Sequence, residues 1–313
     1  MVVIKEFFEK YQKRLQIENI AASFSSDKKI KKKIVHRPGL DLVYARNIST
    51  NHIVVFGKSE ISYLKGLDKK VRYKKINAIL TETTPAVIIS RKMRPLKELV
   101  QVCEKKKISI FRSSYSTMEL ISKLILVLND ELSPVVTLHG TLVEVFGIGV
   151  LIQGESSVGK SEAALGLIER GHRLISDDVV QVKKRENVLI GTGPELTRHL
   201  MEIRGIGIIN VAHLYGATCV RPDKVLDIIV KLEQWDDSHF YDRVGLEEKF
   251  MDILDNNVPF HLMPIKPGRD VILLIETLSL NHRLKGMGYN SAKEFNIKLL
   301  ETIGRKRKIS ENN

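Results

Sequence analysis

The stretch Gly154-Glu155-Ser156-Ser157-Val158-Gly159-Lys160-Ser161 decides the fold of this chain, because it fits the pattern G-x-x-x-x-G-K-S/T of a phosphate-binding loop, or P-loop. The apolar residues 149–152 before it predict a strand, and residues 162–171 predict a helix that ends at a glycine C-cap. A strand–loop–helix unit places backbone N–H groups and the positive end of the helix dipole around one anion. Lys160 would reach the terminal phosphates of a nucleotide, and the Ser161 hydroxyl would ligate Mg²⁺. The alternative, a glycine-rich turn before an ordinary helix, is disfavoured by the flanking strand and helix.

The composition limits the class of protein. The chain has 313 residues, enough for about two domains, and its 43% hydrophobic and 28% charged residues are ordinary for a soluble globular protein. No apolar run approaches the roughly 18 residues that cross a bilayer, and the N-terminus lacks the apolar core of a signal peptide. The only cysteines are Cys103 and Cys219, too few for a disulfide framework or a zinc cluster, so we expect a reducing, cytoplasmic location.

The net charge of +13 makes nucleic acid a partner to consider. Much of the excess is local, in the runs Lys28–Lys33, Lys65–Lys75, Lys105–Lys107 and Arg305–Lys308. No helix-turn-helix, zinc finger or basic stripe with interleaved aromatic residues accompanies them. We interpret these runs as solvated faces and expect no direct nucleic-acid binding and no membrane binding, since an acidic protein or a phosphate substrate uses the same charge equally well.

Residues 1–130 predict a small α/β domain with a mostly parallel sheet, because strands alternate with helices. The hydrophobic spacing predicts helices at 4–15, 59–67, 96–105 and 117–128, and strands at 53–56, 78–80, 86–89 and 108–111. We find no catalytic constellation there, which leaves scaffold, assembly or regulation as its role. Polar residues and a proline at Asn129–Pro134 place the boundary, so residues 131–313 form a second domain.

Two adjacent carboxylates follow the P-loop helix. Residues 136–147 predict alternating strands with a break at His139-Gly140, and Asp177-Asp178 end a short apolar strand at 174–175. This strand is expected to lie beside the P-loop strand in a βαβ unit, so that its carboxyl end faces the crevice of the phosphates. The pair could hold a metal or take a proton; the alternative is an exposed turn.

Later segments are less regular. Two glycines and two charges interrupt the apolar run Leu200–Asn210, which indicates backbone that approaches something closely. Residues 224–233 predict a strand, and residues 263–269 predict a rigid turn that presents Lys266 and Arg269. Amphipathic helices are expected at 271–283 and 291–303.

Together these segments resemble the HPr kinase/phosphorylase family of bacterial enzymes. The matching residues, in order, are His139-Gly140, the P-loop, Gly171–Asp178, Met201–Gly207, Tyr241-Asp242-Arg243 and Pro267-Gly268-Arg269, with a weaker match at Arg37–Leu40. The family phosphorylates a serine of the phosphocarrier protein HPr with ATP, and removes that phosphate with inorganic phosphate, giving pyrophosphate. One departure is Ser157, where the family usually has glycine; the turn must tolerate a Cβ, and we expect a modest effect on affinity.

The resemblance implies roles for particular residues. Gly154, Glu155, Ser156, Ser157, Val158, Gly159, Lys160 and Ser161 would bind the phosphates of ATP and pyrophosphate, with Ser161 and Glu202 holding Mg²⁺. One of Asp177 and Asp178 would accept the serine proton; we favour Asp178, with Asp177 assisting. His139 and Arg243 would orient groups or stabilise charge in the transition state.

The resemblance also implies roles for two longer segments. The family's signature segment corresponds to Met201, Glu202, Ile203, Arg204, Gly205, Ile206, Gly207, Ile208, Ile209 and Asn210. The loop that serves dephosphorylation corresponds to Pro264, Ile265, Lys266, Pro267, Gly268 and Arg269. In this loop the two cations would offset the repulsion between free phosphate and phosphoserine.

The resemblance also implies a homohexamer, a function in carbon catabolite regulation, and a P-loop core resembling phosphoenolpyruvate carboxykinase. Such a core differs from that of protein kinases, and the sequence has no H-R-D or D-F-G element. Two alternatives remain: a P-loop kinase of a small molecule, and a nucleotide-sensing regulator without chemistry.

Overall fold

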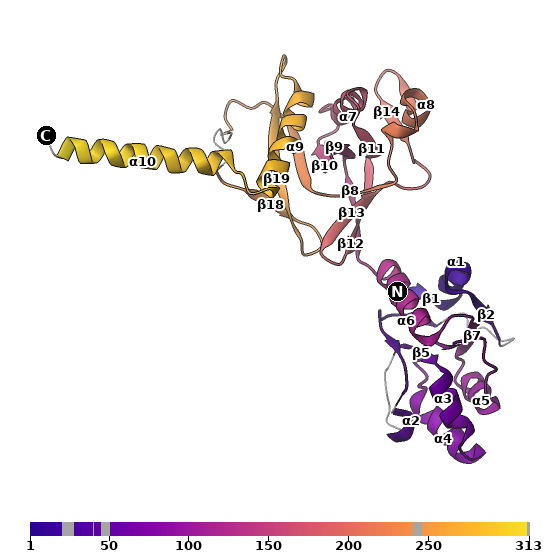
Figure 1. Cartoon of the computed structure of the whole chain (residues 1–313). Coiled ribbons are helices and arrows are strands. Elements are labelled where there is room, and N and C mark those ends of the chain that lie inside the picture. Colours follow the sequence, from indigo (N-terminus) through magenta and orange to yellow (C-terminus); the bar gives the residue numbers. More distant parts are fainter. Residues whose placement is uncertain (21–27, 40, 45–50, 240, 242–245, 312–313) are drawn as a thin grey trace. The chain divides into compact units, whose positions relative to one another are not determined.

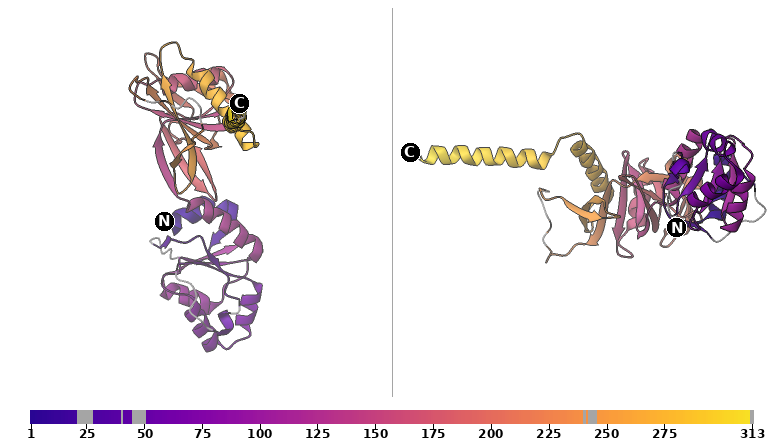
Figure 2. Two further views of the ribbon diagram at one scale, coloured as in Figure 1. Left: turned by 90° about the vertical axis from the view of Figure 1, so that its left-hand side faces the viewer. Right: turned by 90° about the horizontal axis from the view of Figure 1, so that it is seen from below.

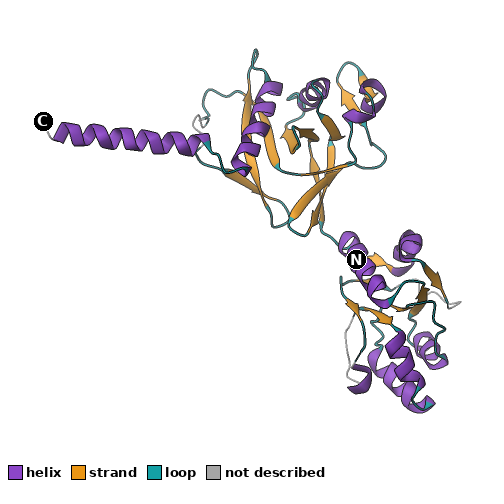
Figure 3. Ribbon diagram, in the orientation of Figure 1, coloured by secondary structure: helices purple, strands orange, loops and turns teal. Residues whose placement is uncertain are grey.

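The computed structural model describes residues 1–20, 28–39, 41–44, 51–239, 241 and 246–311. The chain divides into two units, Met1–Ser133 and Pro134–Asn313. The boundary predicted after residue 130 falls in the last turn of helix α6 (Thr117–Glu131), shortly before this division. Both units combine helices with sheets (Figure 3), so the predicted α/β organisation is confirmed.

The N-terminal unit is built around a five-stranded sheet (Figure 1). Its elements are β1 (Val2–Val3), α1 (Ile4–Leu15), β2 (Ile17–Asn19), β3 (Lys29–Ile30), β4 (Val35–His36), α2 (Asp41–Tyr44), β5 (Ile53–Phe56), α3 (Lys58–Lys65), α4 (Lys69–Ile79), β6 (Ala86–Ile89), α5 (Lys97–Lys105), β7 (Ser109–Ser113) and α6. The strand order is β2-β7-β6-β5-β4, with β4 to β7 parallel and β2 antiparallel at the edge. The mostly parallel sheet predicted for this region is confirmed.

Helices cover both faces of this sheet, which explains its unbroken apolar strands. In β5, Ile53 and Val55 pack with α1 and α6, whereas Val54 and Phe56 pack with α2 to α5. The helix predicted at 4–15 is confirmed, and the apolar residues that predicted it are buried.

One predicted strand of this unit is wrong. Residues 78–80 do not form a strand, because Ala78 and Ile79 are the last residues of α4 and Leu80 is its C-cap. The apolar triplet is the end of a helix: Ile76 and Ile79, one turn apart, are its buried residues, and four of the other positions are lysines. A short apolar run read alone does not distinguish a strand from the buried end of a helix.

The C-terminal unit is richer in strands. Its elements are β8 (Val135–His139), β9 (Thr141–Val145), β10 (Ile148–Gly154), α7 (Lys160–Glu169), β11 (Arg173–Ser176), β12 (Val179–Arg185), β13 (Val188–Thr192), β14 (Leu200–Ile203), β15 (Gly207–Asn210), α8 (Val211–Tyr215), η1 (Ala217–Cys219), β16 (Asp223–Val225), β17 (Ile228–Gln234), β18 (Lys249–Asp252), β19 (Asn257–Ile265), α9 (Val271–Gly286) and α10 (Ser291–Glu311). A six-stranded sheet has the order β11-β9-β10-β17-β19-β18, and a four-stranded antiparallel sheet has the order β16-β13-β12-β8.

The six-stranded sheet lies between two layers (Figures 1 and 2). Helices α7 and α9 cover one face, where Ala164, Leu167 and Ile275 meet apolar residues of β9, β10 and β17. The four-stranded sheet covers the other face, where Val180 and Val182 meet residues of β9, β10 and β17. Because both faces are buried, all five residues of β9 are buried. This core fixes the strands whose ends carry the P-loop and the carboxylates.

Two predictions for this sheet need correction. The strand after α7, β11, does not pair with the P-loop strand β10; it pairs with β9. The reason is the tight β9–β10 hairpin, which already occupies that side of β10. Because β9 is antiparallel to both neighbours, β11 still runs in the direction of β10. The strand predicted at 224–233 is divided at Leu226 and Asp227 into β16 and β17, which belong to different sheets.

Three further observations concern the helices, the cysteines and the exposed apolar residues. Within the described residues, no helix has both the length and the apolar character needed to cross a membrane. Both cysteines are free, with Cys103 buried. The first half of α10 exposes apolar side chains, namely Phe295, Ile297, Leu299, Leu300 and Ile303.

Candidate active site

Four strands of the six-stranded sheet end at the same edge. β10, β17 and β19 are mutually parallel, and β11 runs the same way through its antiparallel neighbour β9. The segments that follow them are the P-loop, Asp177-Asp178, residues 235–239 and the turn at 266–269. Ligands of α/β sheets bind outside the carboxyl ends of parallel strands. The topology therefore gathers at one edge four of the segments that the sequence singled out.

The P-loop leaves β10 at Gly154 and enters α7 at Lys160. The Lys160 ammonium donates to the carbonyl oxygens of Gly154 at 3.1 Å and Glu155 at 3.0 Å, which holds it across the loop. Ser157 has a φ of 77°, in the left-handed region that costs an L-residue roughly 1–2 kcal/mol. A glycine at this position would avoid that cost, so Ser157 tolerates its Cβ in a strained conformation.

Asp177 connects three elements of the unit. Its carboxylate accepts hydrogen bonds from the Thr141 hydroxyl at 2.6 Å, from the Ser161 hydroxyl at 3.2 Å and from the backbone N–H of Glu202 at 3.3 Å. The side chain is buried, with 8% of its surface exposed. Burial raises the pKa of this carboxyl, and the hydrogen bonds from Thr141, Glu202 and Ser161 oppose that rise. Asp177 is therefore fixed against the P-loop helix.

Asp178 is exposed and lies beside His139. Its backbone has a φ of 64°, and its carbonyl oxygen accepts the N–H of Gly140 at 3.1 Å. His139 pairs with Val179 across β8 and β12, so the sheet register holds it next to Asp178. The His139 side chain is also exposed, and its carbonyl oxygen accepts from the Gln153 amide at 3.2 Å. The two adjacent aspartates thus differ: Asp177 is buried and held by hydrogen bonds, whereas Asp178 is exposed and can be reached by a substrate.

The segment 200–210 is a hairpin of β14 and β15 that contacts the P-loop. Met201 and Ile203 are buried in the core beneath α7, while Glu202 between them is exposed. Arg204 donates to the Ser156 hydroxyl at 3.1 Å, which joins the hairpin to the P-loop.

No atom of the described residues comes close to the hairpin glycines, because a Cβ on Gly205 or Gly207 would meet nothing there within 4 Å. Their φ angles of 83° and 97° show that the turn needs left-handed backbone. The close approach of this backbone to another group stays a prediction.

A stack of rings and a cation forms beyond β17. The rings of Trp235 and Tyr241 lie 4.9 Å apart, Tyr241 also stacks on His239 at 4.9 Å, and the Lys266 ammonium lies 5.4 Å from the Trp235 ring. The Tyr241 hydroxyl donates to Glu233 at 3.0 Å. The stack links the segment that leads toward Arg243 with the cationic turn. Asp242 and Arg243 themselves lie outside the described residues.

The turn at 266–269 is shorter than predicted, because Pro264 and Ile265 are the last residues of β19. Arg269 folds back and donates to the carbonyl oxygen of Pro264 at 3.0 Å, while Lys266 rests on Trp235. Both cations are therefore held near the edge of the sheet.

The residues proposed to hold Mg²⁺ lie close to one another. Ser161 and the backbone of Glu202 are both bonded to Asp177, so these three residues are gathered at the start of α7. Oxygen donors of this kind suit Mg²⁺, which uses one or two carboxylates and keeps several waters. Among the described residues, no group of three or more His, Cys, Asp or Glu side chains is placed to hold a metal.

Some features of the site were not anticipated from the sequence. They are the Thr141–Asp177 hydrogen bond, the Arg204–Ser156 hydrogen bond and the Lys266–Trp235 contact. Thr141 directly follows His139-Gly140. This proximity in sequence was the one signal that could have indicated a role for Thr141 in the site.

Comparisons with known proteins match both units. The family model described as "HPr Serine kinase N terminus" matches residues 2–128, and the model described as "HPr Serine kinase C-terminal domain" matches residues 130–299. The HPr kinase/phosphorylase of Listeria monocytogenes serotype 4a (strain HCC23) is 40% identical over 305 residues, which cover 97% of this chain and 96% of that protein. The HPr kinase/phosphorylase of Bacillus pumilus (strain SAFR-032) is 42% identical over 269 residues, or 85% of this chain and 87% of that protein.

A solved structure is also similar. The Hpr(Ser) kinase/phosphatase from Coxiella burnetii is 41% identical and covers 51% of this chain and 98% of its own, with a TM-score of 0.47.

Proposed function

Because the chain belongs to the HPr kinase/phosphorylase family, we propose that it is a bifunctional enzyme that acts on HPr in carbon catabolite regulation. In one direction it transfers the γ-phosphoryl group of ATP to a serine of HPr. In the other it transfers the phosphoryl group of phosphoserine to inorganic phosphate, which yields pyrophosphate. The observation that carries the proposal is the hydrogen bond of the P-loop serine Ser161 to Asp177, in a chain that aligns with an HPr kinase/phosphorylase over 97% of its length.

The P-loop binds the phosphates in both directions. Its backbone N–H groups and the N-terminus of α7 face the anion. Lys160, now bonded to the carbonyl oxygens of Gly154 and Glu155, is already at the loop and offsets charge on the transferred group. One site therefore serves ATP and pyrophosphate.

Asp178 moves the proton. Asp177 has both carboxylate oxygens engaged by Thr141, Ser161 and the Glu202 N–H, so it positions Ser161 and the β14–β15 hairpin. Asp178 is exposed at the same edge, and it accepts the proton of the HPr serine during phosphorylation. By microscopic reversibility, it returns a proton to the serine oxygen during phosphorolysis.

Two further groups stabilise charge. His139 lies next to Asp178 in the sheet register, and Arg243 follows the segment that the Trp235–Tyr241 stack anchors. We assign both to the phosphoryl oxygens that gain charge in the transition state.

Mg²⁺ is held by Ser161 and Glu202 in this proposal. The bound ion offsets charge on the phosphoryl oxygens. Asp177 fixes the Ser161 hydroxyl and the Glu202 backbone, so it orients both ligands from behind.

The cationic turn serves phosphorolysis most. Free phosphate must approach phosphoserine, another anion, and Lys266 and Arg269 offset the repulsion. In the kinase direction the P-loop and Lys160 already hold the γ-phosphate, so the extra cations matter less.

Assembly and location follow from the family. We propose a homohexamer, which the exposed apolar side chains of α10 support because such side chains are commonly covered in an assembly. Two free cysteines agree with a cytoplasmic location.

The test is a coupled assay with purified HPr. Mg-ATP is added first and phosphoserine is measured, and phosphate is then added and pyrophosphate is measured. Phosphotransfer without HPr would point to a small-molecule kinase, and nucleotide binding without any phosphotransfer would point to a regulator.

A further inference from the structure

The segment that follows strand β6 in the N-terminal unit, here called the basic loop (residues 91–97), carries four cations. They are Arg91, Lys92, Arg94 and Lys97, and all four are exposed. The basic loop begins where β6 and its parallel neighbour β7 end, and the chain continues from β6 to α5 and from β7 to α6. Helices α5 and α6 cover opposite faces of the sheet, so this boundary is a place where α/β sheets commonly bind ligands.

Hydrogen bonds of its main chain hold the basic loop across this boundary. The Arg91 N–H donates to the carbonyl oxygen of Tyr115 at 2.8 Å, and the Lys92 N–H donates to that of Ser113 at 2.8 Å. The loop's own backbone therefore binds the end of β7, where a small ligand would bind in another α/β sheet. The basic loop thus offers its exposed side chains to a partner instead of a crevice to a small molecule.

The positions of these cations are unfavourable for folding. Arg91 and Lys92 have φ angles of 59° and 49°, in the left-handed region that costs each L-residue roughly 1–2 kcal/mol. Lys97 is the first residue of α5, which has no side-chain cap, and a cation there opposes the helix dipole. Backbone strain of this kind is concentrated at functional sites. These costs indicate that the charges serve a function other than stability.

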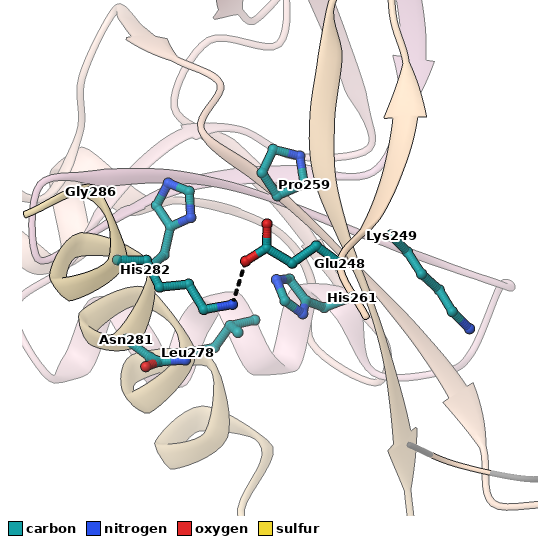
Figure 4. A pocket seen from close by; sticks show the side chains of 9 residues that line it. Glu248, Lys249, Pro259, His261, Leu278, Asn281, His282 and Gly286 are labelled. Carbon is teal, nitrogen blue, oxygen red and sulfur yellow. Dashed lines mark hydrogen bonds and ion pairs between the residues drawn. The ribbon is translucent and has the colours of Figure 1, made fainter. Parts of the chain in front are cut away.

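Among the described residues, no carboxylate pairs with any of the four cations. A cation with a structural role has a carboxylate close by, as Lys285 of α9 has Glu248 at 2.9 Å (Figure 4). Glu98, the next residue along the chain, pairs with Arg72 at 3.1 Å instead. Glu119, in the first turn of α6, is exposed, and this single acid leaves the surface with a positive charge. The basic loop therefore needs an anionic partner from outside.

The features of the basic loop favour an acidic protein segment over a nucleic acid. Single strands bind by stacking their bases on aromatic rings, but Tyr115, whose carbonyl oxygen binds Arg91, has the Lys123 ammonium over its ring at 4.7 Å. A duplex is read by a helix or a β-ribbon in its groove, and the basic loop is neither. A second copy of this chain does not fit either, because it has 50 basic and 37 acidic residues.

We propose that the basic loop is a docking surface for an acidic segment of another protein, whose carboxylates pair with Arg91, Lys92, Arg94 and Lys97. The surface belongs to the unit Met1–Ser133, which contains none of the residues assigned above to phosphotransfer. It gives this unit a role of its own, the recruitment of an acidic partner. Binding weakens with salt, because exposed ion pairs are screened.

Binding is tested on the full-length enzyme with a fluorescein-labelled poly-glutamate peptide as the probe. The double variant Lys92→Gln, Arg94→Gln should bind it about fivefold more weakly at low salt, since one exposed ion pair contributes a factor of roughly 1.5 to 5. Neither side chain has a partner in the described fold to lose, so the variant should fold as before. Fluorescence anisotropy gives the affinities.

A matched double variant at the other end of α5 is the control. Lys105→Gln, Lys107→Gln removes the same charge from two exposed lysines, and Lys107 is left-handed like Lys92, with a φ of 52°. Its affinity for poly-glutamate should change less than about twofold. Equal losses in the two double variants, or no loss in either, would overturn the proposal, because binding would then follow the overall charge of the chain.

Two further measurements identify the kind of partner and its place. Labelled single-stranded and duplex oligonucleotides of the same charge as the peptide should bind more weakly than poly-glutamate. Tighter oligonucleotide binding that Lys92→Gln, Arg94→Gln abolishes would assign the surface to nucleic acid and overturn the proposal. Carbodiimide joins peptide carboxylates to lysine amines, so products at Lys92 and Lys97 would support the surface, and products mainly at Lys105 and Lys107 would contradict it.

Activity on HPr separates this inference from the proposed function. Both rates and the KM for HPr should be the same in Lys92→Gln, Arg94→Gln as in the original enzyme. A higher KM for HPr in this variant, and not in Lys105→Gln, Lys107→Gln, would make the basic loop part of substrate docking and overturn the assignment to a separate partner. A lack of activity on HPr in the original enzyme contradicts the proposed function, and the peptide measurements still decide on the surface.

Discussion

The tetrapeptide Gly-Lys-Ser-Glu occurs twice in this chain, and the two copies do different things. Gly57-Lys58-Ser59-Glu60 opens α3 after the parallel strand β5, and Gly159-Lys160-Ser161-Glu162 opens α7 after the parallel strand β10. In α3 the Glu60 carboxylate turns back to accept the Gly57 N–H at 3.0 Å, and Arg37 pairs with it at 2.7 Å. In α7 no side chain caps the helix.

The backbone of the glycine explains the difference. Gly57 is extended, with a φ of −100°, so Glu60 can complete a capping arrangement with its N–H. Gly159 is left-handed, with a φ of 91°, and Glu162 makes no such bond. Four extra residues, Glu155–Val158, separate β10 from Gly159, whereas Gly57 follows β5 directly. The start of α7 has the features that a phosphate site requires: no side chain caps the helix, and a loop precedes it.

The largest effect is expected from a substitution in the second copy of the tetrapeptide, at the P-loop. Lys160→Ala should abolish both phosphorylation and phosphorolysis, because both pass one phosphoryl group through the P-loop. Lys58→Ala, at the same place in the first copy, should leave both rates near the original values. Rates of phosphoserine and pyrophosphate formation measure this. Retention of either activity in Lys160→Ala would rule out a shared site.

The second prediction concerns the carboxylates beside α7. Asp178→Asn should lower the kinase rate by roughly 10²–10⁴-fold while ATP still binds, because it removes the proton acceptor and keeps the shape. Calorimetry with ATP and a phosphoserine assay provide the two measurements. An unchanged rate would move the base to Asp177 or away from the pair.

The third prediction concerns a substitution in the first copy of the tetrapeptide, at the start of α3. Glu60→Ala leaves Arg37 and the Gly57 N–H without their partner, so the free energy of unfolding should fall by about 1–3 kcal/mol. Glu162→Ala, the same position in α7, should change it by no more than about 0.5 kcal/mol, because that side chain makes no cap. Urea denaturation compares them. Equal losses would mean that Glu162 caps α7 after all.

The fourth prediction addresses the turn at the P-loop edge. Arg269→Ala should lower phosphorolysis at least about tenfold, or roughly 1.4 kcal/mol of barrier, and lower the kinase rate much less. Arg283→Ala, an exposed cation further along α9, is the control. Assays of both directions on each variant decide the matter, and equal losses in Arg269→Ala would assign the turn to the common site or the fold.

The smallest effect is expected from Ser157, in the loop that precedes α7 and has no equivalent between β5 and α3. Ser157→Gly removes a left-handed Cβ from the P-loop, so ATP should bind up to about fivefold more tightly, the equivalent of about 1 kcal/mol. Ser157→Ala keeps the Cβ and should show no gain. Calorimetric affinities for ATP test this, and a gain in both variants would trace the effect to the hydroxyl.

The sequence predicted those helices and strands that the local spacing of apolar residues determines. It did not predict strand pairings and helix ends that depend on residues far away in the chain. Ile53–Phe56 is a strand as predicted because its four apolar residues are too few for a helix and are flanked by turn residues. Ala78–Leu80 has the same character yet ends a helix, since the helix that contains Ala78 and Ile79 begins at Lys69. The pairing of β11 could not be predicted locally, because β9 forms a hairpin with β10 and occupies the edge of β10 that β11 was expected to join.

The same limit applies to the site. The segments at the sheet edge were predicted because motifs and strand ends are local features. Asp177 and Asp178 are adjacent and identical in type, so only the fold shows that one is buried under Thr141 and the other is exposed. The assignment of Asp178 as the base and the roles of His139 and Arg243 stay predictions.

The position of Asp177 also has a consequence for the order in which the protein folds. Its partners Thr141, Ser161 and Glu202 stand 36, 16 and 25 residues away along the chain. Contacts between distant residues form late, because each closes a loop of chain at an entropic cost. A partly folded molecule can hold the P-loop helix without the β14–β15 hairpin, and it then lacks the brace behind Ser161 and Glu202. We therefore expect catalysis to appear only with the last docking step, so that incompletely folded copies leave HPr unmodified.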